Sequence, residues 1–288
     1  MTWGETIDRA AEFLGSKGVE DAHTAGELLA ARLLRTSRGM LGGELGKEVP
    51  EKFLDAMRRG VSRLSKGEPV QYVIGEWDFR TLTLKCDRRA LIPRPETEEL
   101  VTRVLAWLSS ESARTGRSNL VVADVGTGTG AIALSIVAEF GGAVVVGTDI
   151  SEDAVALARE NAEKCGLSGR VKFVVADGLA DFDGRMSLDA VVSNPPYIET
   201  AVCDTLAPNV RDYEPRIALD GGESGLDFFD RYLGEALNVL RPGGAVFFEI
   251  GESQGEAVRE LMFEYGYDQI SVEKDFAGHD RYASAVIP

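Results

Sequence analysis

The residues best suited to chemistry are Asn194-Pro195-Pro196-Tyr197, which directly follow an apolar run at residues 188–192. The run predicts a buried strand, and two consecutive prolines cannot continue a sheet's hydrogen bonding, so the strand must end on a stiff turn. In an open α/β sheet, ligands bind at this carboxyl edge. An amide, a backbone carbonyl and an aromatic ring held there suit a planar, nitrogen-bearing substrate.

The chemistry that this group predicts is methylation of a planar nitrogen, which is a poor nucleophile because its lone pair is delocalised. We expect the Asn194 amide oxygen and the Pro195 carbonyl to accept the substrate's N–H groups, and the Tyr197 ring to stack on its plane. Acceleration would come mainly from positioning, and the acceptors would stabilise positive charge growing on nitrogen. No general base of the usual kind is evident. An isolated motif of this type could equally be a plain strand-ending turn.

A glycine-rich turn, Asp124-Val125-Gly126-Thr127-Gly128-Thr129-Gly130, ends an earlier predicted strand and opens a helix. Glycines allow the tight turn and let a ligand approach the backbone closely. The G-x-G-x-G spacing differs from the dinucleotide pattern G-x-G-x-x-G, and no Gly-Lys-Ser/Thr follows as in a P-loop. The turn therefore predicts a ligand-binding loop that is neither a dinucleotide loop nor a P-loop.

Two further carboxylates end the next predicted strands. Asp149 ends the second strand, where it would bind two ribose hydroxyls, and Asp177 ends the third, within reach of an adenine edge. Acidic strand ends around a glycine turn suit a nucleoside without phosphates, and an acidic pocket suits a sulfonium cation. S-adenosylmethionine (AdoMet) is therefore the expected cofactor.

From residue 119 onward, predicted strands and helices alternate, which indicates an α/β domain with a parallel sheet covered by helices on both faces. We expect strands at residues 120–125, 143–149, 171–176, 188–193, 244–250, 268–275 and 281–287. We expect helices at residues 129–139, 152–165, 225–240 and 253–265.

The chain before this domain has a different pattern. Residues 1–68 predict three short helices, the second capped by Asp21 and the third begun by Pro50. Residues 69–92 have strand-like spacing, starting at residues 70–74, and predict a β-hairpin linker. Six arginines on these helices could form basic patches that dock a partner, or they could lie on ordinary solvated helix faces. They are Arg32, Arg35, Arg38, Arg58, Arg59 and Arg63.

The segment at residues 91–99 opens the catalytic domain. Pro93 and Pro95 hold it extended, and Thr97 is expected to cap a helix that ends at Leu108. A surface loop is expected from residue 109 to 118. Because the segment opens the catalytic domain, we expect it to line the site.

Composition restricts the classes of protein that fit. Residues 1–70 carry equal numbers of acidic and basic side chains, so the whole net charge of −16 lies in residues 71–288, which argues against bulk nucleic acid as substrate. No apolar run approaches the ~18 residues of a membrane span, and no secretory signal is evident. Three scattered cysteines and two histidines give no zinc-ligand spacing. A reduced, cytoplasmic protein without a structural metal fits best.

With these motifs in view, the sequence resembles the HemK-type protein-(glutamine-N5) methyltransferases that modify peptide chain release factors. Asn-Pro-Pro-Tyr alone is shared with DNA and RNA amino-methyltransferases, whereas residues 93–98 and 213–222 are far more specific. The likeness also includes residues 69–72 and 274–278, so it runs through most of the chain.

The resemblance implies a class I AdoMet-dependent methyltransferase fold, with a Rossmann-like seven-stranded sheet. It implies a helical substrate-docking domain at residues 1–68, the β-hairpin linker at residues 69–92, and the methyltransferase domain at residues 93–288. It further implies that AdoMet methylates the glutamine of a Gly-Gly-Gln motif in release factors, with no membrane and no direct nucleic-acid partner.

The resemblance also assigns site residues. Family members often carry an aromatic residue where this chain has Gly178, so we expect Leu179 or Phe182 to stack on adenine. The catalytic residues would be Asn194, Pro195 and Tyr197. The cofactor-binding set would be Gly126, Thr127, Gly128, Thr129, Gly130, Asp149, Asp177, Gly178 and Asn194. The substrate-binding set would be Arg94, Glu96, Asn194, Pro195, Pro196 and Tyr197, with no metal ligand.

Two alternatives remain at the level of sequence. A nucleic-acid adenine-N6 or guanine-N2 methyltransferase would bind a flat exocyclic amine with the same Asn194–Tyr197 turn, although the acidic catalytic half argues against it. A non-catalytic binding protein could use the fold as an interaction module. The glycine loop and Asn194 argue against that, because such a module need not keep both.

Overall fold

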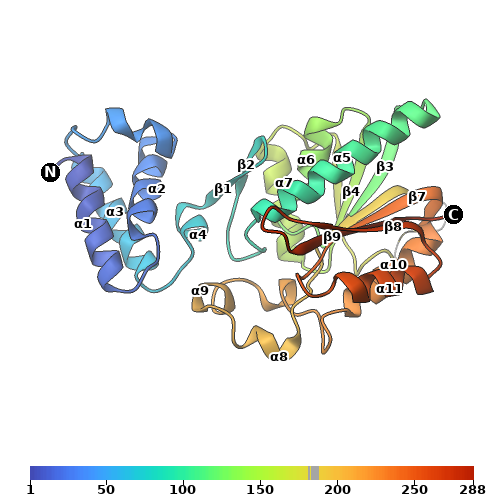
Figure 1. Ribbon diagram of the computed structural model, residues 1–288. Helices are drawn as coiled ribbons and strands as arrows, with labels where there is room; N and C mark the ends of the chain where they lie inside the picture. The colour runs from blue at the N-terminus through green and yellow to red at the C-terminus, as the bar shows by residue number, and fades with distance from the viewer. Residues whose placement is uncertain (181, 183–187) are drawn as a thin grey trace. The chain divides into compact units, whose positions relative to one another are not determined.

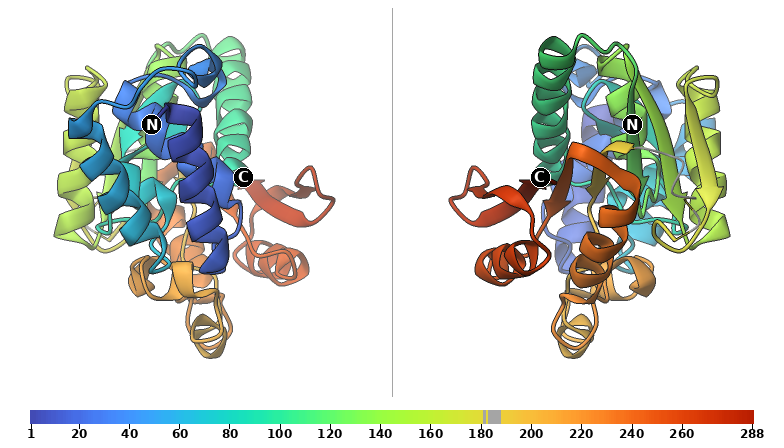
Figure 2. Two further views of the ribbon diagram at one scale, coloured as in Figure 1. Left: turned by 90° about the vertical axis from the view of Figure 1, so that its left-hand side faces the viewer. Right: turned by 90° about the vertical axis from the view of Figure 1, so that its right-hand side faces the viewer.

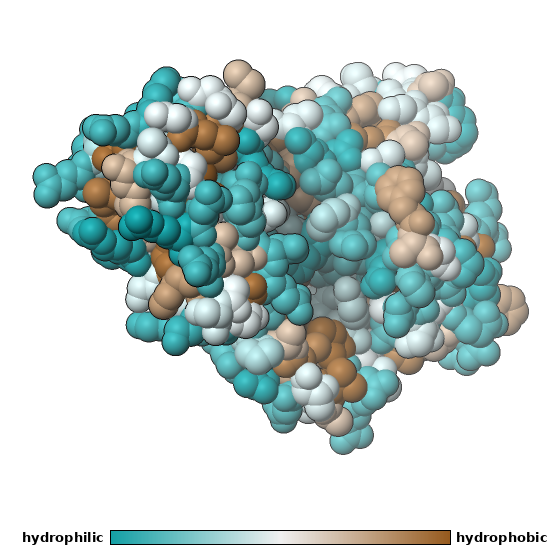
Figure 3. Space-filling model, turned by 60° about the vertical axis from the view of Figure 1, so that its left-hand side comes forward, coloured by the Kyte–Doolittle hydropathy of each residue, from teal (hydrophilic) through white to brown (hydrophobic). Residues whose placement is uncertain are grey.

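The computed structural model describes residues 1–180, 182 and 188–288 (Figure 1). The chain forms two compact units, Met1–Trp77 with Ala207–Tyr213, and Asp78–Leu206 with Glu214–Pro288. Figure 3 shows a mostly hydrophilic surface with hydrophobic side chains scattered between. In the part of the chain that is described, no helix has the length and apolar character needed to cross a membrane.

The first unit is helical, as the sequence predicts. A capping box starts its first helix, because the Thr2 hydroxyl accepts from the Glu5 N–H and the Glu5 carboxylate accepts from the Thr2 N–H. Trp3, Leu29 and Leu64 belong to the core that these helices share. The elements are α1 (Trp3–Ser16), α2 (Ala22–Leu34), η1 (Arg38–Gly43), α3 (Glu51–Leu64), α4 (Val70–Ile74) and α9 (Pro208–Arg211).

Two local predictions for this unit are wrong. Asp21 lies at the N-cap of α2 in a left-handed conformation and makes no side-chain capping bond. Residues 70–74 form a helix, not a strand, because Val70, Val73 and Ile74 have helical spacing and pack on the helical core. The Arg63 guanidinium also donates to two carbonyls of this short helix.

The hairpin follows directly after α4. Strands β1 (Glu76–Phe79) and β2 (Leu82–Lys85) form a two-stranded sheet, so the predicted hairpin exists but begins later than expected. Four of the six arginines in the proposed basic patches form ion pairs with nearby carboxylates, which favours solvated helix faces. The pairs are Arg32–Glu76, Arg38–Glu27, Arg58–Asp55 and Arg63–Glu68.

The second unit contains the predicted seven-stranded sheet, in the order β5-β4-β3-β6-β7-β9-β8. The strands from β5 to β7 are parallel, and β9 pairs with β7 and β8 in the antiparallel sense. The strand order changes direction between β3 and β6, so ligands are expected at the carboxyl ends of these two strands. The strands are β3 (Leu120–Val125), β4 (Ala143–Asp149), β5 (Val171–Val175), β6 (Leu188–Ser193), β7 (Leu240–Glu249), β8 (Asp268–Lys274) and β9 (Asp280–Val286).

Helices cover both faces of this sheet (Figures 1 and 2). Successive strand residues point to opposite faces, so Val122 and Phe247 belong to one buried core and their neighbours Ala123 and Phe248 to the other. The first core is closed by α5 (Pro95–Thr115), α6 (Ala131–Glu139) and α7 (Glu152–Lys164), and the second by α10 (Asp227–Val239) and α11 (Gly255–Glu264).

Helix α5 differs from its prediction at both ends. It begins at Pro95 after an Arg94 N-cap, so Thr97 lies inside the first turn and does not cap the helix. It continues to Thr115, so the loop expected at residues 109–118 is wrong for residues 109–115 and is confirmed only for 116–118. Buried Glu111 stabilises these added turns, because its carboxylate accepts from Arg114 on the same helix and from Arg241 at the start of β7.

Candidate active site

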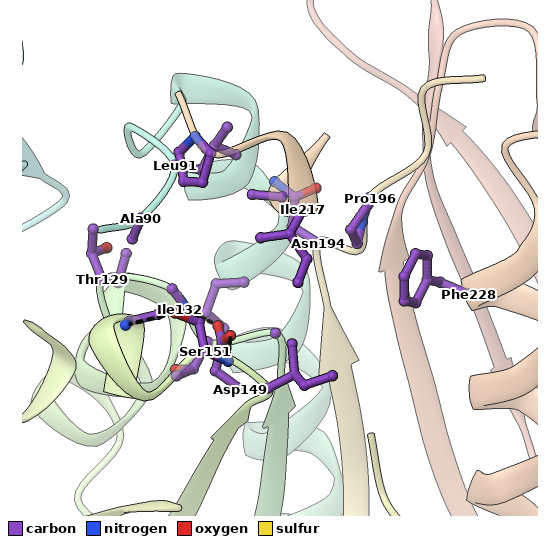
Figure 4. A pocket seen from close by; sticks show the side chains of 18 of the residues that line it. Ala90, Leu91, Thr129, Ile132, Asp149, Ser151, Asn194, Pro196, Ile217 and Phe228 are labelled. Atoms are coloured by element: carbon purple, nitrogen blue, oxygen red, sulfur yellow. Dashed lines mark hydrogen bonds between the residues drawn. The ribbon is translucent and has the colours of Figure 1, made fainter. Parts of the chain in front are cut away.

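A cavity of about 270 Å³ lies at the carboxyl ends of β3, β4 and β6, where the topology places a ligand site. Figure 4 shows Asp149 and Asn194, from the ends of β4 and β6, beside the same cavity, with Phe228 on a further wall. Residues from the glycine loop also line the cavity, and so do Arg94 and Thr97. The structure thus brings together the glycine loop and the Asn-Pro-Pro-Tyr turn, as predicted.

The glycine loop requires its glycines. Gly126, Gly128 and Gly130 all have positive φ, at 71°, 54° and 81°, in the region that side chains rarely adopt. A Cβ atom on Gly130 would also lie 3.0 Å from the Phe173 ring. The loop therefore stays close to the sheet, and Thr127 is fixed by a bond from its N–H to the Thr148 carbonyl.

A buried carboxylate holds the loop to the helix that follows it. One Asp124 oxygen accepts from the Thr127 hydroxyl at 2.6 Å and from the Ala133 N–H at 3.1 Å. Burial raises the pKa of Asp124 to about 7, and the nearby Asp149 charge acts in the same direction. The two hydrogen bonds lower the pKa, but by less. Asp124 therefore shapes the loop and does not line the cavity.

Asp149 faces the cavity with both oxygens already oriented. Its Oδ2 accepts from the Gly128 N–H and its Oδ1 from the Ser151 N–H, each at 2.9 Å. Each oxygen has a further lone pair, so the carboxylate can still accept two hydroxyl groups. Burial raises the pKa of Asp149 above its ordinary value. Beside it, Ile150 exposes 52% of its surface and lines the cavity, which gives an apolar wall that sequence reasoning missed.

Asp177 and Gly178 line another part of the cavity wall. The Asp177 carboxylate forms an ion pair with Arg231 at 2.8 Å. Gly178 has a φ of 71°, and a Cβ atom there would lie 2.4 Å from the Glu235 carboxylate. An aromatic side chain at position 178 would therefore require its surroundings to move.

The two residues expected to stack on adenine do not line the cavity. Leu179 is buried in the second core of the sheet, and Phe182 packs against the same core. The expectation for these two is therefore wrong. Phe228, at the start of α10, lines the cavity and supplies an aromatic ring that no local sequence signal marked (Figure 4).

The Asn-Pro-Pro-Tyr turn contributes unequally to the cavity. Asn194 and Pro196 line it, whereas Pro195 is buried and Tyr197 is half-buried against the second core. The Asn194 Nδ2 atom donates to the Thr97 hydroxyl at 3.0 Å. The Tyr197 hydroxyl points to Glu249, at 3.4 Å, and burial raises the pKa of Tyr197.

A later segment of the chain supports this turn. The Ile198 N–H donates to the Leu219 carbonyl, and the Gly221 N–H donates to the Ile198 carbonyl. A Cβ atom on Gly221 would lie 2.7 Å from the Cα atom of Tyr197, so only glycine allows this approach. This contact gives a physical reason for the glycine in the segment at residues 213–222.

The other two predicted substrate-binding residues are placed differently. Arg94 lines the cavity, and its guanidinium forms an ion pair with the buried Glu214 carboxylate, which also accepts from the Ile92 N–H. Glu96 is exposed in the first turn of α5 and does not line the cavity. Glu214 was missed as a residue that holds the Pro93-Arg94-Pro95 segment, because its partners lie more than a hundred residues away.

The cavity fits AdoMet by the chemistry of its lining. It offers an oriented carboxylate with free lone pairs, a closely approachable glycine backbone, and apolar side chains at Ile150 and Phe228. No described group of His, Cys, Asp and Glu residues could hold a metal ion. The fold and the site together define a class I AdoMet-dependent methyltransferase.

Comparison with known proteins specifies the family. Residues 5–75 match the PrmC N-terminal domain, and residues 105–209 match the methyltransferase small domain. The release factor glutamine methyltransferase of Moorella thermoacetica is 40% identical over 282 residues, which cover 98% of this chain and 97% of that protein. The corresponding protein of Agrobacterium fabrum is 38% identical over 287 residues, 98% of each chain. The chain belongs to the release factor glutamine methyltransferase family.

A solved structure supports the fold alone. The crystal structure of a methyltransferase from Pyrococcus furiosus aligns with a TM-score of 0.51 at 22% identity. The aligned part covers 71% of this chain and 88% of the Pyrococcus furiosus chain. The shared part is therefore the size of the sheet domain.

The geometry of Asp149 generates a test of cofactor binding. Asp149→Ala should weaken AdoMet binding by about 1.5–3 kcal/mol, because hydrogen bonds to a charged group contribute that much. Titration calorimetry measures the effect. Asp153→Ala, which removes an exposed carboxylate from α7, should leave the affinity unchanged. Equal AdoMet affinity of Asp149→Ala and the unmodified chain would show that Asp149 does not bind the cofactor.

Proposed function

We propose that this chain transfers a methyl group from AdoMet to the side-chain nitrogen (N5) of the glutamine in the Gly-Gly-Gln motif of peptide chain release factors. The observation that carries the proposal is the Asn194 amide at the cavity wall, with its Nδ2 atom occupied by Thr97. This leaves Oδ1 as an acceptor for an N–H group. The family relationship supports the substrate class.

The cofactor would be held by residues at the ends of β3 and β4. The loop from Gly126 to Gly130 would let it approach the backbone, and the lone pairs of Asp149 would accept its ribose hydroxyls. Ile150 and Phe228 would cover the base, beside Asp177 and Gly178. AdoMet held there would supply an electrophilic methyl group: the glutamine nitrogen would take the methyl and give up one proton to water, and the electron pair of the carbon–sulfur bond would stay on sulfur.

The chain's contribution to this reaction is to orient a neutral amide. Asn194 Oδ1 and the Pro195 carbonyl would accept the two N–H groups of the glutamine, so that its nitrogen is fixed. The same acceptors stabilise the positive charge that develops on nitrogen. Pro196 and the stiff turn limit how far these acceptors can move. Substrate contacts of Tyr197, Arg94 and Glu96 stay predictions.

The helical unit is proposed as the docking surface for the release factor. A glutamine side chain offers too little surface to select one protein, so selection requires a contact remote from the reacting amide. Residues 1–68 belong to a separate compact unit with balanced charge, which makes them available for such a contact. A release-factor substrate is also consistent with the predicted cytoplasmic location.

The nucleic-acid alternative is not favoured. Relatives matched over nearly the full length are release factor glutamine methyltransferases, and the net negative charge lies in residues 71–288. The binding-module alternative is disfavoured by the oriented Asp149 and Asn194 side chains.

Mass spectrometry tests the proposed reaction. The chain should add one methyl group to the Gly-Gly-Gln glutamine of an intact release factor in the presence of AdoMet. A factor with that glutamine replaced by alanine should stay unmodified. DNA and RNA should be offered in parallel, and methylation of either one with none of the factor would reverse the assignment.

Replacing Asn194 separates binding from chemistry. Asn194→Ala should lower turnover roughly 10²–10³-fold, as expected for the loss of one preorganised polar contact, while AdoMet affinity is retained. Steady-state kinetics and calorimetry measure the two quantities. The matched control is Asn238→Ala, on the exposed side of α10, which should be fully active. Normal turnover by Asn194→Ala would refute the proposal that Asn194 orients the substrate amide.

The docking proposal is tested by comparing two substrates. Deleting residues 1–68 should lower kcat/KM sharply on the intact release factor, because the remote contact is lost. A short Gly-Gly-Gln peptide cannot use that contact, so the full and shortened chains should methylate it equally. Activity on the peptide also shows that the shortened chain is folded. Equal kcat/KM of both chains on the intact factor would exclude docking by these residues.

A further inference from the structure

Three residues from three different elements form a chain of hydrogen bonds that starts at the cavity wall, where Asn194 and Thr97 lie, and ends at Glu249 behind it. Asn194 follows β6, Thr97 lies in the first turn of α5, and Glu249 is the last residue of β7. The Thr97 hydroxyl and the Glu249 carboxylate are 2.6 Å apart, and the Asn194 Nδ2 atom lies 3.0 Å from the same hydroxyl. Glu249 is only 2% exposed and Thr97 only 5%, so these hydrogen bonds are largely shielded from bulk water.

The chemistry of these groups fixes the direction of the chain of hydrogen bonds. An ionised carboxylate can only accept, so Thr97 must direct its single hydroxyl proton to Glu249. The hydroxyl oxygen can then only accept from Asn194, which must present its Nδ2 atom. Oδ1 is consequently the hydrogen-bond acceptor that Asn194 can offer to a ligand, beside the second N–H of Nδ2.

The same carboxylate reaches the other end of the turn. Its second oxygen lies 3.4 Å from the Tyr197 hydroxyl, and the phenol can donate to it. Glu249 therefore contacts the first residue of Asn-Pro-Pro-Tyr through Thr97 and the last one directly. One buried group thus couples both ends of the turn.

The charges that face Glu249 come from several elements. Arg281 on β9 favours the ionised form, whereas Glu96 on α5 opposes it. Tyr282 on β9 is the residue paired with Glu249 across the sheet. Burial, and to a smaller extent the Glu249 charge, raise the pKa of its phenol. Burial has the largest effect and raises the pKa of Glu249 to about 7.

We propose that Glu249, through Thr97, is a positioning residue that sets which atom of the Asn194 amide faces the substrate. The role rests on the proposed methyl transfer to a glutamine amide. With Glu249 ionised, Oδ1 accepts the substrate's N–H group. With Glu249 protonated, its carboxylic acid O–H can donate a hydrogen bond to the Thr97 oxygen and keep its proton. The Thr97 hydroxyl can then donate to Oδ1, and Asn194 presents Nδ2 to an amide that needs acceptors.

This arrangement also selects glutamine over glutamate. A glutamate carboxylate has no N–H group, so it would place oxygen against the Oδ1 atom that Thr97 and Glu249 hold in place. A buried polar atom left unpaired by the wrong substrate disfavours that substrate strongly. The orientation of one amide would therefore decide which side chain the site accepts.

The test compares kcat/KM for an intact release factor against pH in four variants. In the unmodified chain, kcat/KM should rise with pH through an apparent pKa near 7, because Glu249 must lose its proton. Glu249→Gln and Thr97→Val should lower kcat/KM at pH 8 roughly tenfold or more and should abolish the rise. Thr97→Ser keeps the hydroxyl and should restore both. Glu111→Gln removes another buried carboxylate, remote from the cavity, and should keep the unmodified profile.

Titration calorimetry with AdoMet distinguishes positioning from folding. Glu249→Gln and Thr97→Val should bind AdoMet as tightly as the unmodified chain. The positioning role is overturned if either variant keeps the unmodified activity and pH profile, if AdoMet binding falls with activity, or if Thr97→Ser behaves as Thr97→Val. An unmodified chain that binds AdoMet but does not methylate the factor would overturn the proposed function, and the positioning role with it.

Discussion

The site depends on a buried and a half-buried carboxylate at the carboxyl ends of the strands, which accept hydrogen bonds from the loops that follow. Asp124 holds Thr127 and the start of α6, and Asp149 holds Gly128 and Ser151. Each bond satisfies a backbone or hydroxyl donor that would otherwise be costly to bury. The glycine loop is therefore shaped by the protein itself, and a ligand need not supply the free energy to order it.

The substrate side of the cavity is built by the same means. Glu249 fixes Thr97 and Tyr197, and Glu214 fixes the backbone of Ile92 together with Arg94. Both carboxylates lie on segments that follow the Asn-Pro-Pro-Tyr turn by many residues. The motif that carries the chemistry is thus short, but its geometry is set by contacts with α5, β7 and the segment before α10.

The strands and helices of the sheet domain could be predicted from the sequence because apolar periodicity is a local property. Residues 70–74 could not, because a mainly apolar segment of five residues fits either period and packing on the helical core decides the outcome. The end of α5 could not be predicted either, because Glu111 stabilises it through Arg241 in a distant strand. Glu249 and Phe228 carried no motif, and only the folded topology brings Phe228 to the cavity and Glu249 to Thr97 behind its wall.

The helical unit has a consequence for how the chain folds during synthesis. Its closing segment, Ala207–Tyr213, lies beyond β6 in the sequence, and the Tyr213 hydroxyl donates to the Lys66 carbonyl at 2.7 Å. Domains usually fold in order as the chain leaves the ribosome, with the N-terminal one first. Here the first unit is incomplete until β3, β4, β5 and β6 of the seven-stranded sheet have been synthesised, so it cannot be finished before much of the second unit has left the ribosome.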